Sequence, residues 1–487
     1  MAIHPVRYEE FTKDELLQVI RRLRDSPDNL AHAVDTAARA VRSGEPSAKK
    51  QKKLAYNQKP PKPFDFSRYR TRHIALKFSY AGEKYAGFAR QEHMEHTIER
   101  YLIDALLRAR MVEDFNNCGY SRCGRTDAGV SALGQVVGLI VRSNVPADAI
   151  ILDDKTIDDI RPNESFRVQL PDGTIKTLME LDYCVSLNSA LPADIRVYGW
   201  APAPMPEWSA RFHCIGRVYK YFFHRRNMDL ERMREAAALL VGVDQDYRNF
   251  CRLDPSVPTY TRSISSFKVH ETTPADSAGG NYYQLCYLEI HGKAFLWHQV
   301  RCMAAILFLV GRGLEQPALV TQLLDVNATP RKPQYEMASE LPLVLHDCKY
   351  DTMHMTYTPG VLNRVYCDIE SQWEAASLRT AMLRNQLETL KEITIERGQA
   401  LEEVQKRLKH LRPDQVEAKV PVVAPTDGKE LLPFGSVWPS LPPAGKGLKH
   451  IPIMQRRTGH SVEEKLQKSL RKRMAKELSA ENSEVEA

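Results

Sequence analysis

The sequence predicts an α+β protein built from two successive halves of the ferredoxin-like kind. Segments with strand character occur in pairs separated by helical segments, and two such sets follow one another along the chain. A doubly wound parallel sheet is the alternative that this order disfavours. The chain has 487 residues, of which 43% are apolar, enough to fill two cores. We therefore expect a two-part globular body with tails.

The first half begins near Arg72 with a strand in which apolar side chains recur at every second position, at Ile74, Leu76 and Phe78. A helix is expected next, with Thr97 as a possible N-cap and an apolar stripe formed by Ile98, Leu102, Ala105, Leu106 and Ala109. The β-branched residues at 136–141 indicate a buried strand.

The second half continues the pattern. Further strands are predicted at 195–200, 217–224, 263–270 and 282–290, and helices near 229–241, 298–311 and 316–325. Residues 151–180 are polar and rich in turn residues without a clear period, which indicates a surface insertion.

These signals predict five segments. They are a basic, largely disordered extension at 1–70, a first half at 71–205, a second half at 206–355, a long helix at 360–412, and a basic tail at 413–487. Residues 11–24 read as a short amphipathic helix inside the extension. In the long helix, Leu383, Leu387 and Leu390 and then Leu401, Val404, Leu408 and Leu411 are spaced by four and three, interrupted by Gly398. This stripe predicts either a coiled-coil seam joining two copies or a helix packed on its own body.

Charge and cysteine content limit the function classes. The net charge is +7, with 16 Lys/Arg against 9 Asp/Glu in residues 1–72 and 10 against 6 in residues 441–487. Polyanion binding and an ordinary solvated surface both fit this distribution. Nine scattered cysteines without a C-x-x-C pair indicate free thiols and no zinc site.

The sequence shows the features expected of a protein located inside the cell. The N-terminus lacks an apolar signal-peptide core, and the longest apolar run, 303–311, is half the length of a membrane span. We therefore expect a soluble intracellular protein without a membrane segment. The lysine cluster at 49–53 is either a nuclear import signal or a solvated charge run. Both nucleus and cytoplasm stay open as locations.

A candidate catalytic carboxylate lies in the loop 123–130, Cys-Gly-Arg-Thr-Asp-Ala-Gly-Val. The loop joins a helix to a strand, and its glycines permit tight turns that leave the middle side chains exposed. Asp127 is therefore presented either for chemistry or as an ordinary turn residue.

Two further segments carry candidate binding residues. In the strand at 217–223, Tyr219 lies at the entry end beside Arg217, and Lys220 lies on the opposite face. Aromatic side chains beside basic ones commonly stack unpaired bases and hold phosphates. In the segment 292–301, His298 and Arg301 share one face near a helix N-terminus, and the Arg301 guanidinium is expected to pair with a carboxylate.

Together, in this order, these segments resemble the TruA family of pseudouridine synthases, which isomerise uridine in tRNA. The resemblance covers about residues 72–350 and includes the segment 80–91, the loop 124–130, the strand start 217–221 and the segment 295–301. The segments 130–136, 247–254 and 300–311 resemble most the eukaryotic members that act at positions 38 and 39 of the anticodon arm. Ala128 departs from the Lys often found there in those members.

The resemblance implies a role for each site residue. Asp127 is the catalytic carboxylate, Tyr219 stacks on the target base, Arg301 pairs with Asp127 and holds its pKa down, and Arg125 fills the space left by the flipped nucleotide. Possible RNA contacts are Arg217, Lys220 and His298. Whether Asp127 acts as nucleophile or as proton acceptor stays open.

The resemblance also implies a shared, mostly antiparallel sheet with a central basic cleft, a reaction that needs no metal or cofactor, and tRNA as partner. A homodimer through the C-terminal helix is a second possible partner. The rival hypotheses are a catalytically inactive tRNA-binding or folding protein on the same scaffold, and a passive adaptor organised around the long helix.

Overall fold

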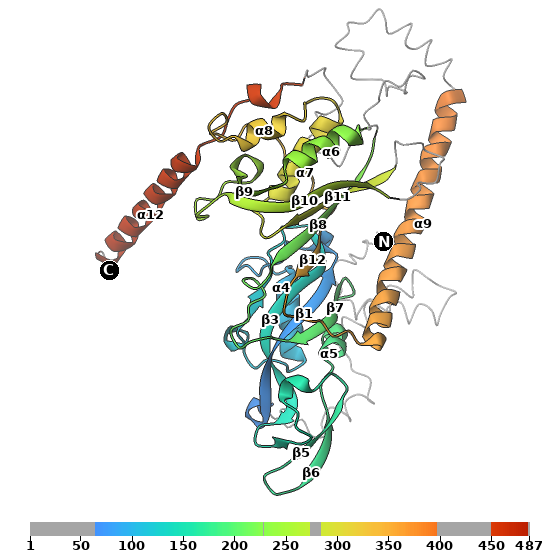
Figure 1. Ribbon diagram of the computed structural model, residues 1–487, viewed down its shortest axis with the longest axis vertical. Coiled ribbons are helices and arrows are strands. Elements are labelled where there is room, and N and C mark those ends of the chain that lie inside the picture. The colour runs from blue at the N-terminus through green and yellow to red at the C-terminus, as the bar shows by residue number, and fades with distance from the viewer. Residues whose placement is uncertain (1–63, 227, 273–283, 397–449, 486–487) are drawn as a thin grey trace, which may run out of the picture. The chain divides into compact units, whose positions relative to one another are not determined.

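The computed structural model describes residues 64–226, 228–272, 284–396 and 450–485 (Figure 1). The chain divides into two compact units, Met1–Asp65 and Phe66–Ala487, and the elements below belong to the second. The helix expected at 11–24, the lysine cluster at 49–53 and the leucine stripe beyond Gly398 lie outside the described residues.

A large mixed sheet organises the described part of the chain, in the strand order β7-β1-β3-β12-β8-β11-β10-β9, with the short β2 paired to β3. Its N-terminal strands are β1 (Tyr69–Tyr80), β2 (Ser121–Arg122), β3 (Ser131–Pro146) and β7 (Ile195–Pro202). β1 lies between β3 and β7, antiparallel to both. Its alternating apolar residues pack inward as predicted, and Ile74, Leu76 and Phe78 are fully buried.

The C-terminal strands form an antiparallel meander. They are β8 (Gly216–His224), β9 (Gly242–Asp246), β10 (Thr261–Glu271) and β11 (Leu285–Gly292). β11 pairs antiparallel with both β8 and β10, and β9 closes the edge on β10. The predicted strands at 217–224 and 263–270 match these bounds within two residues.

One strand joins the two groups, and the sequence did not predict it. β12 (Leu343–Lys349) lies between β3 and β8, parallel to β3 and antiparallel to β8. Gly134 permits the close approach of β3 to β12, because a Cβ there would lie 2.7 Å from the carbonyl oxygen of His346. This is the one parallel pair among the described strand pairs of this sheet, which makes the sheet mixed.

Helices pack over this sheet in two groups. The first comprises α4 (Ile98–Arg108) and α5 (Tyr183–Ala190), and the second α6 (Leu230–Leu239), α7 (Gln299–Gly311) and α8 (Leu319–Leu324). Each group covers its own buried apolar cluster. Short 3-10 turns occur at Phe66–Arg68, Gly82–Lys84, Phe115–Asn117, Ile157–Asp159, Arg248–Phe250 and Ile453–Gln455. The sequence predicted α4, α6, α7 and α8 within three residues at each end but missed α5.

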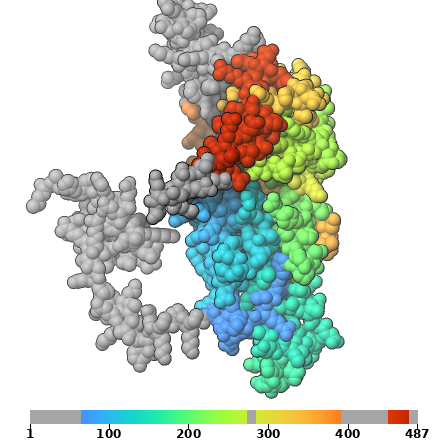
Figure 2. Space-filling view, turned by 90° about the vertical axis from the view of Figure 1, so that its left-hand side faces the viewer, coloured from blue at the N-terminus to red at the C-terminus, as the bar shows by residue number. Residues whose placement is uncertain are grey.

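The segment 151–180, in which the sequence showed no clear period, contains strands that were not predicted. A separate three-stranded sheet forms there from β4 (Ile150–Ile151), β5 (Ser165–Gln169) and β6 (Ile175–Met179). It has its own small core, in which Phe166 and Val168 are buried. The exposed polar residues on its outer face hid the strand period, since only β5 alternates in burial. Figure 2 shows this segment in teal at the end of the molecule remote from the C-terminal segment.

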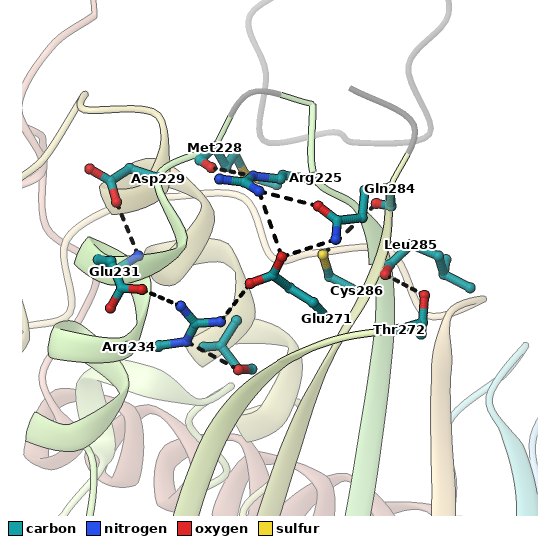
Figure 3. Close-up of polar contacts among 11 residues, drawn as sticks. Arg225, Met228, Asp229, Glu231, Arg234, Glu271, Thr272, Gln284, Leu285 and Cys286 are labelled. Atoms are coloured by element: carbon teal, nitrogen blue, oxygen red, sulfur yellow. Dashed lines mark hydrogen bonds and ion pairs between the residues drawn. The ribbon is translucent and has the colours of Figure 1, made fainter. Parts of the chain in front are cut away.

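A polar cluster lies at the ends of β8, β10 and β11 (Figure 3). Glu271 at the end of β10 accepts hydrogen bonds from Arg234 Nη2 and Gln284 Nε2, both at 2.9 Å, and forms an ion pair with Arg225 at 3.7 Å. The hydrogen bond from Arg234 is the main cause that lowers the pKa of Glu271. The cluster ties α6 to the strand ends.

Two long helices follow the sheet. α9 (Pro359–Glu396) begins against β7, and α12 (Val462–Val485) follows a segment that packs on the C-terminal strands and helices. In that segment Ile453 is fully buried, and Glu315 accepts a hydrogen bond from the Ile453 amide at 2.7 Å. Figure 2 shows it in red against the yellow and green part of the surface. None of the helices within the described ranges has the length and apolar character that crossing a bilayer requires.

Candidate active site

The candidate carboxylate lies in the loop between β2 and β3. This loop is close to the joint of the sheet, which is the place where β12 connects the N-terminal and C-terminal strand groups. Its backbone is fixed at several points: Cys123 N donates to Val136 O at 2.9 Å, and Val130 N to Asp127 O at 3.2 Å. The Asp127 side chain is 25% exposed. The loop therefore presents this carboxylate at the surface while its own backbone stays ordered.

Buried polar side chains support the loop from below. Gln135 on β3 is fully buried, and its amide bonds both the N–H and the carbonyl of Gly124, at 3.3 and 3.1 Å. The Tyr80 hydroxyl at the end of β1 lies 2.8 Å from Thr126 Oγ1. The sequence identified neither Tyr80 nor Gln135 as a site residue; a buried Gln on a strand beside a glycine-rich loop was the available signal.

The segment after β1 wraps around the same loop. Phe88 N donates to Thr126 O at 3.1 Å, and Gly129 N donates to Tyr85 O at 3.1 Å. Gly87 adopts a φ of +99°, and a Cβ there would lie 3.1 to 3.3 Å from backbone atoms of Thr126, Asp127 and Ala128. This glycine thus permits a close approach that fixes the position of the loop 123–130.

Arg301 approaches the loop from α7, but its ion pair differs from the one expected. Its Nη2 lies 2.7 Å from Glu340 Oε2, and its Nε donates to Ala338 O at 2.8 Å. The direct pair with Asp127 is therefore replaced by a pair with Glu340. The reason is local: Arg301 is 8% exposed, and the chain at 338–340 supplies two oxygen acceptors beside it.

Burial and the charge of Arg301 act on the pKa of Asp127 in opposite directions. The pKa of Asp127 is raised, chiefly because burial disfavours the charged carboxylate, and the Glu340 charge adds to this. The charge of Arg301 and a hydrogen bond from Trp297 lower that pKa without overcoming burial. Trp297, which the sequence did not identify, thus belongs to the site.

His298 lies beside the carboxylate in an unusual backbone conformation. It caps α7 with a φ of 60°, and its Nε2 lies 3.6 Å from Asp127 Oδ2. Burial, helped by the charges of Arg301 and Arg252, lowers the pKa of His298 to about 4. His298 is therefore neutral near pH 7 and forms no ion pair with Asp127 there.

Tyr219 on β8 lies between the two apolar clusters and packs against both. Its ring meets Phe295 edge to face, with the ring centroids 5.1 Å apart. Burial raises the pKa of the Tyr219 hydroxyl well above its usual range, which keeps the ring neutral. The structure thus packs this aromatic side chain between the two strand groups of the sheet.

Arg217 and Lys220 make intramolecular contacts. Arg217 Nη2 donates to Cys123 O at 2.7 Å, and Nη1 donates to Lys293 O. This guanidinium therefore links β8 to the start of the loop 123–130. Lys220 Nζ lies 3.7 Å from Glu289 and 4.9 Å from the centre of the Tyr287 ring.

Several arginines gather around the loop. Arg125 is exposed, and the nearby charge of Arg122, with contributions from burial and from Arg211, lowers its pKa. Repulsion of this kind is relieved when an anion binds between the cations. Arg211 lies over the ring of Phe212 at 5.3 Å, and Phe212 is 78% exposed. Arg122, Arg211 and Phe212 were missed because no period or motif in the sequence distinguishes them.

Other ligand types find little support in the described residues. Within residues 64–396 and 450–485, less the gaps at 227 and 273–283, no group of three or more His, Cys, Asp or Glu side chains is placed to hold a metal ion. All nine cysteines are free, as expected, and only Cys367 is exposed.

Comparisons with known proteins show similarity to tRNA pseudouridine synthases. The family described as tRNA pseudouridine synthase matches residues 236–351. The tRNA pseudouridine(38/39) synthase of Bos taurus is 40% identical over 344 residues, which cover 70% of this chain and 68% of the bovine one. The protein of that name from Homo sapiens is 36% identical over 395 residues, covering 80% and 78%. The one from Saccharomyces cerevisiae is 38% identical over 356 residues, covering 71% and 72%.

Proposed function

Because the chain belongs to the tRNA pseudouridine synthase family, we propose that it isomerises uridine to pseudouridine in tRNA, with Asp127 as the catalytic carboxylate. The observation that carries this assignment is the position of Asp127. It is the carboxylate of a rigid, partly exposed loop at the joint of the sheet, next to Trp297, His298 and the charge of Arg301.

The reaction needs only groups of the protein. The N1–C1′ bond of uridine breaks, a C5–C1′ bond forms, the C5 proton leaves to solvent and N1 gains a proton. An ionised aspartate can take part as the nucleophile at C1′ or as the acceptor of a sugar proton. In both roles the carboxylate must be charged, so the opposing influences of burial and Arg301 on the Asp127 pKa set the pH at which the enzyme becomes active.

Substrate binding follows from the arginines and aromatics around the loop. A uridine inside a stem must leave its stack to reach Asp127, which costs a few kcal/mol. Tyr219 stacks on the flipped base, and Arg125, exposed beside the carboxylate, fills the vacated space. Arg122 and Arg211 contact flanking phosphates, and the exposed Phe212 offers a further stacking surface. Of the remaining proposed contacts, Lys220 and His298 act on RNA directly, and Arg217 acts by holding the loop.

The finer architecture belongs to the same proposal. We infer that the N-terminal and C-terminal strand groups are two ferredoxin-like halves that share the sheet, with a central basic cleft over β12. The strand order and the two separate apolar clusters support the halves. The arginines around Asp127 support the cleft.

Target position, partners and location complete the proposal. Since the bovine, human and yeast relatives carry the name tRNA pseudouridine(38/39) synthase, we propose positions 38 and 39 of the anticodon arm as targets. The proposed partners are tRNA and, through the helix that starts at Pro359, a second copy of the chain. The proposed location is the nucleus and the cytoplasm; fluorescence microscopy of the tagged chain with the 49–53 lysines replaced tests it.

The decisive experiment compares two aspartates. Release of tritium from 5-tritiated uridine in tRNA is measured for Asp127→Asn and for the control Asp153→Asn, an exposed residue of the small sheet that pairs with Arg167. We expect Asp127→Asn to abolish release while tRNA affinity survives, and Asp153→Asn to behave as wild type.

The outcomes separate the rival functions. Release at the wild-type rate by Asp127→Asn would rule out the catalytic assignment. A wild-type chain that binds tRNA but releases no tritium would instead identify an inactive tRNA-binding protein. Mapping of pseudouridine in tRNA from cells without this chain tests positions 38 and 39.

A further inference from the structure

The helix α12, red in Figure 1, is anchored to the body at its first turn. Lys465 Nζ donates to Leu253 O at 3.5 Å, and Glu464 forms an ion pair with Arg331 at 2.5 Å. Val462 packs against the apolar cluster of the C-terminal strands and helices. The start of α12 is therefore fixed on the body, and the rest of the helix continues from this point.

This anchor is one residue away from a contact with the candidate active site. Leu253 follows Arg252, whose backbone N–H donates to Trp297 O at 2.9 Å. The Arg252 guanidinium also lies 4.2 Å from the centre of the Trp297 ring. Trp297 in turn hydrogen-bonds Asp127. An RNA held at Asp127 therefore lies close to the start of α12.

Beyond the anchor α12 carries a dense positive charge. Residues 465–475 include five basic side chains and no acidic one. Lys465, Lys468 and Lys472 are spaced by three and four, so they form a row along one side of the helix, and Arg471 lies beside this row. The row is about 10 Å long. These four side chains are called the basic face of α12 below.

The basic face is open to an outside anion. Lys468, Arg471 and Lys472 are exposed. Among the described side chains of α12, the ion pairs are those of Glu464, which leaves the basic face without an acidic partner there. Lys468 and Lys472 are four residues apart, a spacing at which like charges destabilise a helix. The folded chain thus keeps an unfavourable row of charge that an anion bound across it would stabilise.

We propose that the basic face of α12 binds the phosphate backbone of the tRNA whose target uridine is held at Asp127. The proposal rests on tRNA as the substrate of the proposed function and adds a binding surface to it, but it does not depend on the chemical role of Asp127. Lysine side chains act as point charges that suit phosphates, and phosphate contacts position a nucleic acid without reading its sequence. The helix therefore adds affinity and no sequence preference.

The opposite side of α12 fits a different occupant. Leu466, Leu470 and Met474 recur at a spacing of four and are 44%, 48% and 62% exposed. A helix with one basic and one apolar side also suits an anionic membrane surface, which needs the apolar side to insert. RNA needs only the cations. The anchor beside Trp297 favours RNA, because it brings the basic face to the site where the proposed substrate binds.

The first test measures tRNA affinity by filter binding at several salt concentrations. Lys468→Gln, Arg471→Gln and Lys472→Gln are combined in the full chain, because glutamine removes the charge and keeps a high helix propensity. Binding at low salt should weaken about tenfold or more. The slope of log K against log salt should fall by about two to three, since each neutralised phosphate contributes about 0.7 to 0.9. An unchanged affinity and slope would overturn the proposal.

Two matched variants control for the shape of the helix. Leu466→Gln, Leu470→Gln and Met474→Gln place three glutamines on the opposite side and should leave tRNA affinity at the wild-type value. Lys468→Arg with Lys472→Arg keeps the charge and should also bind as the wild type does. Equal losses of affinity in the two glutamine variants would show that α12 matters through its packing, and this result would refute phosphate binding by the basic face.

The second test separates binding from chemistry. In tritium release, the charge-removing variant should show a KM for tRNA raised by the factor found in filter binding. Its affinity for a tRNA without uridine at positions 38 and 39 should fall by that factor too, since phosphates carry no sequence. A lower kcat with unchanged affinity would overturn the proposal. A wild-type chain that binds tRNA through the basic face but releases no tritium would refute the proposed isomerase and leave this binding surface standing.

A third test addresses the membrane alternative. The wild-type chain is sedimented with vesicles of phosphatidylserine and phosphatidylcholine, and we expect it to stay in the supernatant when tRNA is present. Vesicle binding that the opposite-side glutamines abolish, together with a wild-type tRNA affinity of the charge-removing variant, would assign α12 to an anionic lipid surface. That result would overturn the proposal.

Discussion

Replacing Gly87 with alanine tests whether the segment after β1 sets the position of Asp127. The backbone of Gly87 has a φ of +99°, where an L side chain costs about 1–2 kcal/mol. Its Cβ would also lie 3.1 Å from Thr126 O, 3.2 Å from Ala128 N and 3.3 Å from the Asp127 carbonyl carbon. These contacts are a few tenths of an ångström too close, so the catalytic loop must move.

The expected loss of activity follows from that displacement. A misplacement of about 1 Å can cost a hundredfold in rate, so a shift of a few tenths should lower kcat about tenfold. The backbone strain should lower Tm by about 2–4 °C or more. Tritium release from tRNA at saturating substrate measures kcat, and thermal unfolding measures Tm.

Gly173 provides the matched control. It has a φ of +83° in the turn between β5 and β6, and an added Cβ would meet nothing within 4 Å. Gly173→Ala should therefore lower the stability through the strain of a positive φ, as Gly87→Ala does. It also changes the entropy of the unfolded chain by the same amount as Gly87→Ala. Its kcat should stay at the wild-type value. A wild-type kcat for Gly87→Ala, or an equal loss for Gly173→Ala, would refute the reasoning.

Substitutions at three further positions test the electrostatics and the scaffold of the site. Trp297→Phe removes a hydrogen bond that lowers the Asp127 pKa. Since activity is lost as the pH falls through that pKa, the acid limb of kcat should move to higher pH. An unmoved limb in the pH–rate profile would remove Trp297 from this role. Arg217→Lys cannot reproduce the bonds to Cys123 O and Lys293 O, so kcat should fall about tenfold with little change in tRNA affinity measured by filter binding. A loss confined to affinity would make Arg217 an RNA contact instead. Tyr219→Phe should keep turnover whereas Tyr219→Ala should lose it about tenfold or more; equal kcat values for the two would argue against stacking.

The sequence predicted the local elements well, because their signals are local. The period of two at Ile74, Leu76 and Phe78 located β1, and the apolar stripe after Thr97 located α4. The small sheet at 150–179 escaped prediction because most of its side chains are exposed and its strands are short. β12 escaped for a different reason: its partners on β3 and β8 are more than a hundred residues away in the sequence, and only the fold brings them together.

The site, too, could be predicted only where its signals are local. The sequence and the family resemblance brought Asp127, Tyr219 and Arg301 to one place, but their electrostatic relation depends on burial, which the sequence does not contain. The partner of Arg301 is Glu340, and the pKa of Asp127 is raised, because the folded chain surrounds both groups. Trp297 and Gln135 contribute through burial and through contacts with residues distant in sequence, so the local pattern did not distinguish them from their neighbours.

The position of β12 has a consequence for synthesis of the chain. This strand is the last one of the sheet to leave the ribosome, yet it lies in the middle of the strand order. Until residue 349 is made, β3 and β8 each present an unfinished edge, and the nascent chain must protect both from pairing with other chains. The same order delays the completion of the joint at which Asp127 lies. A prematurely terminated chain would therefore lack a finished site, and RNA modification would be confined to molecules whose translation has passed the whole body.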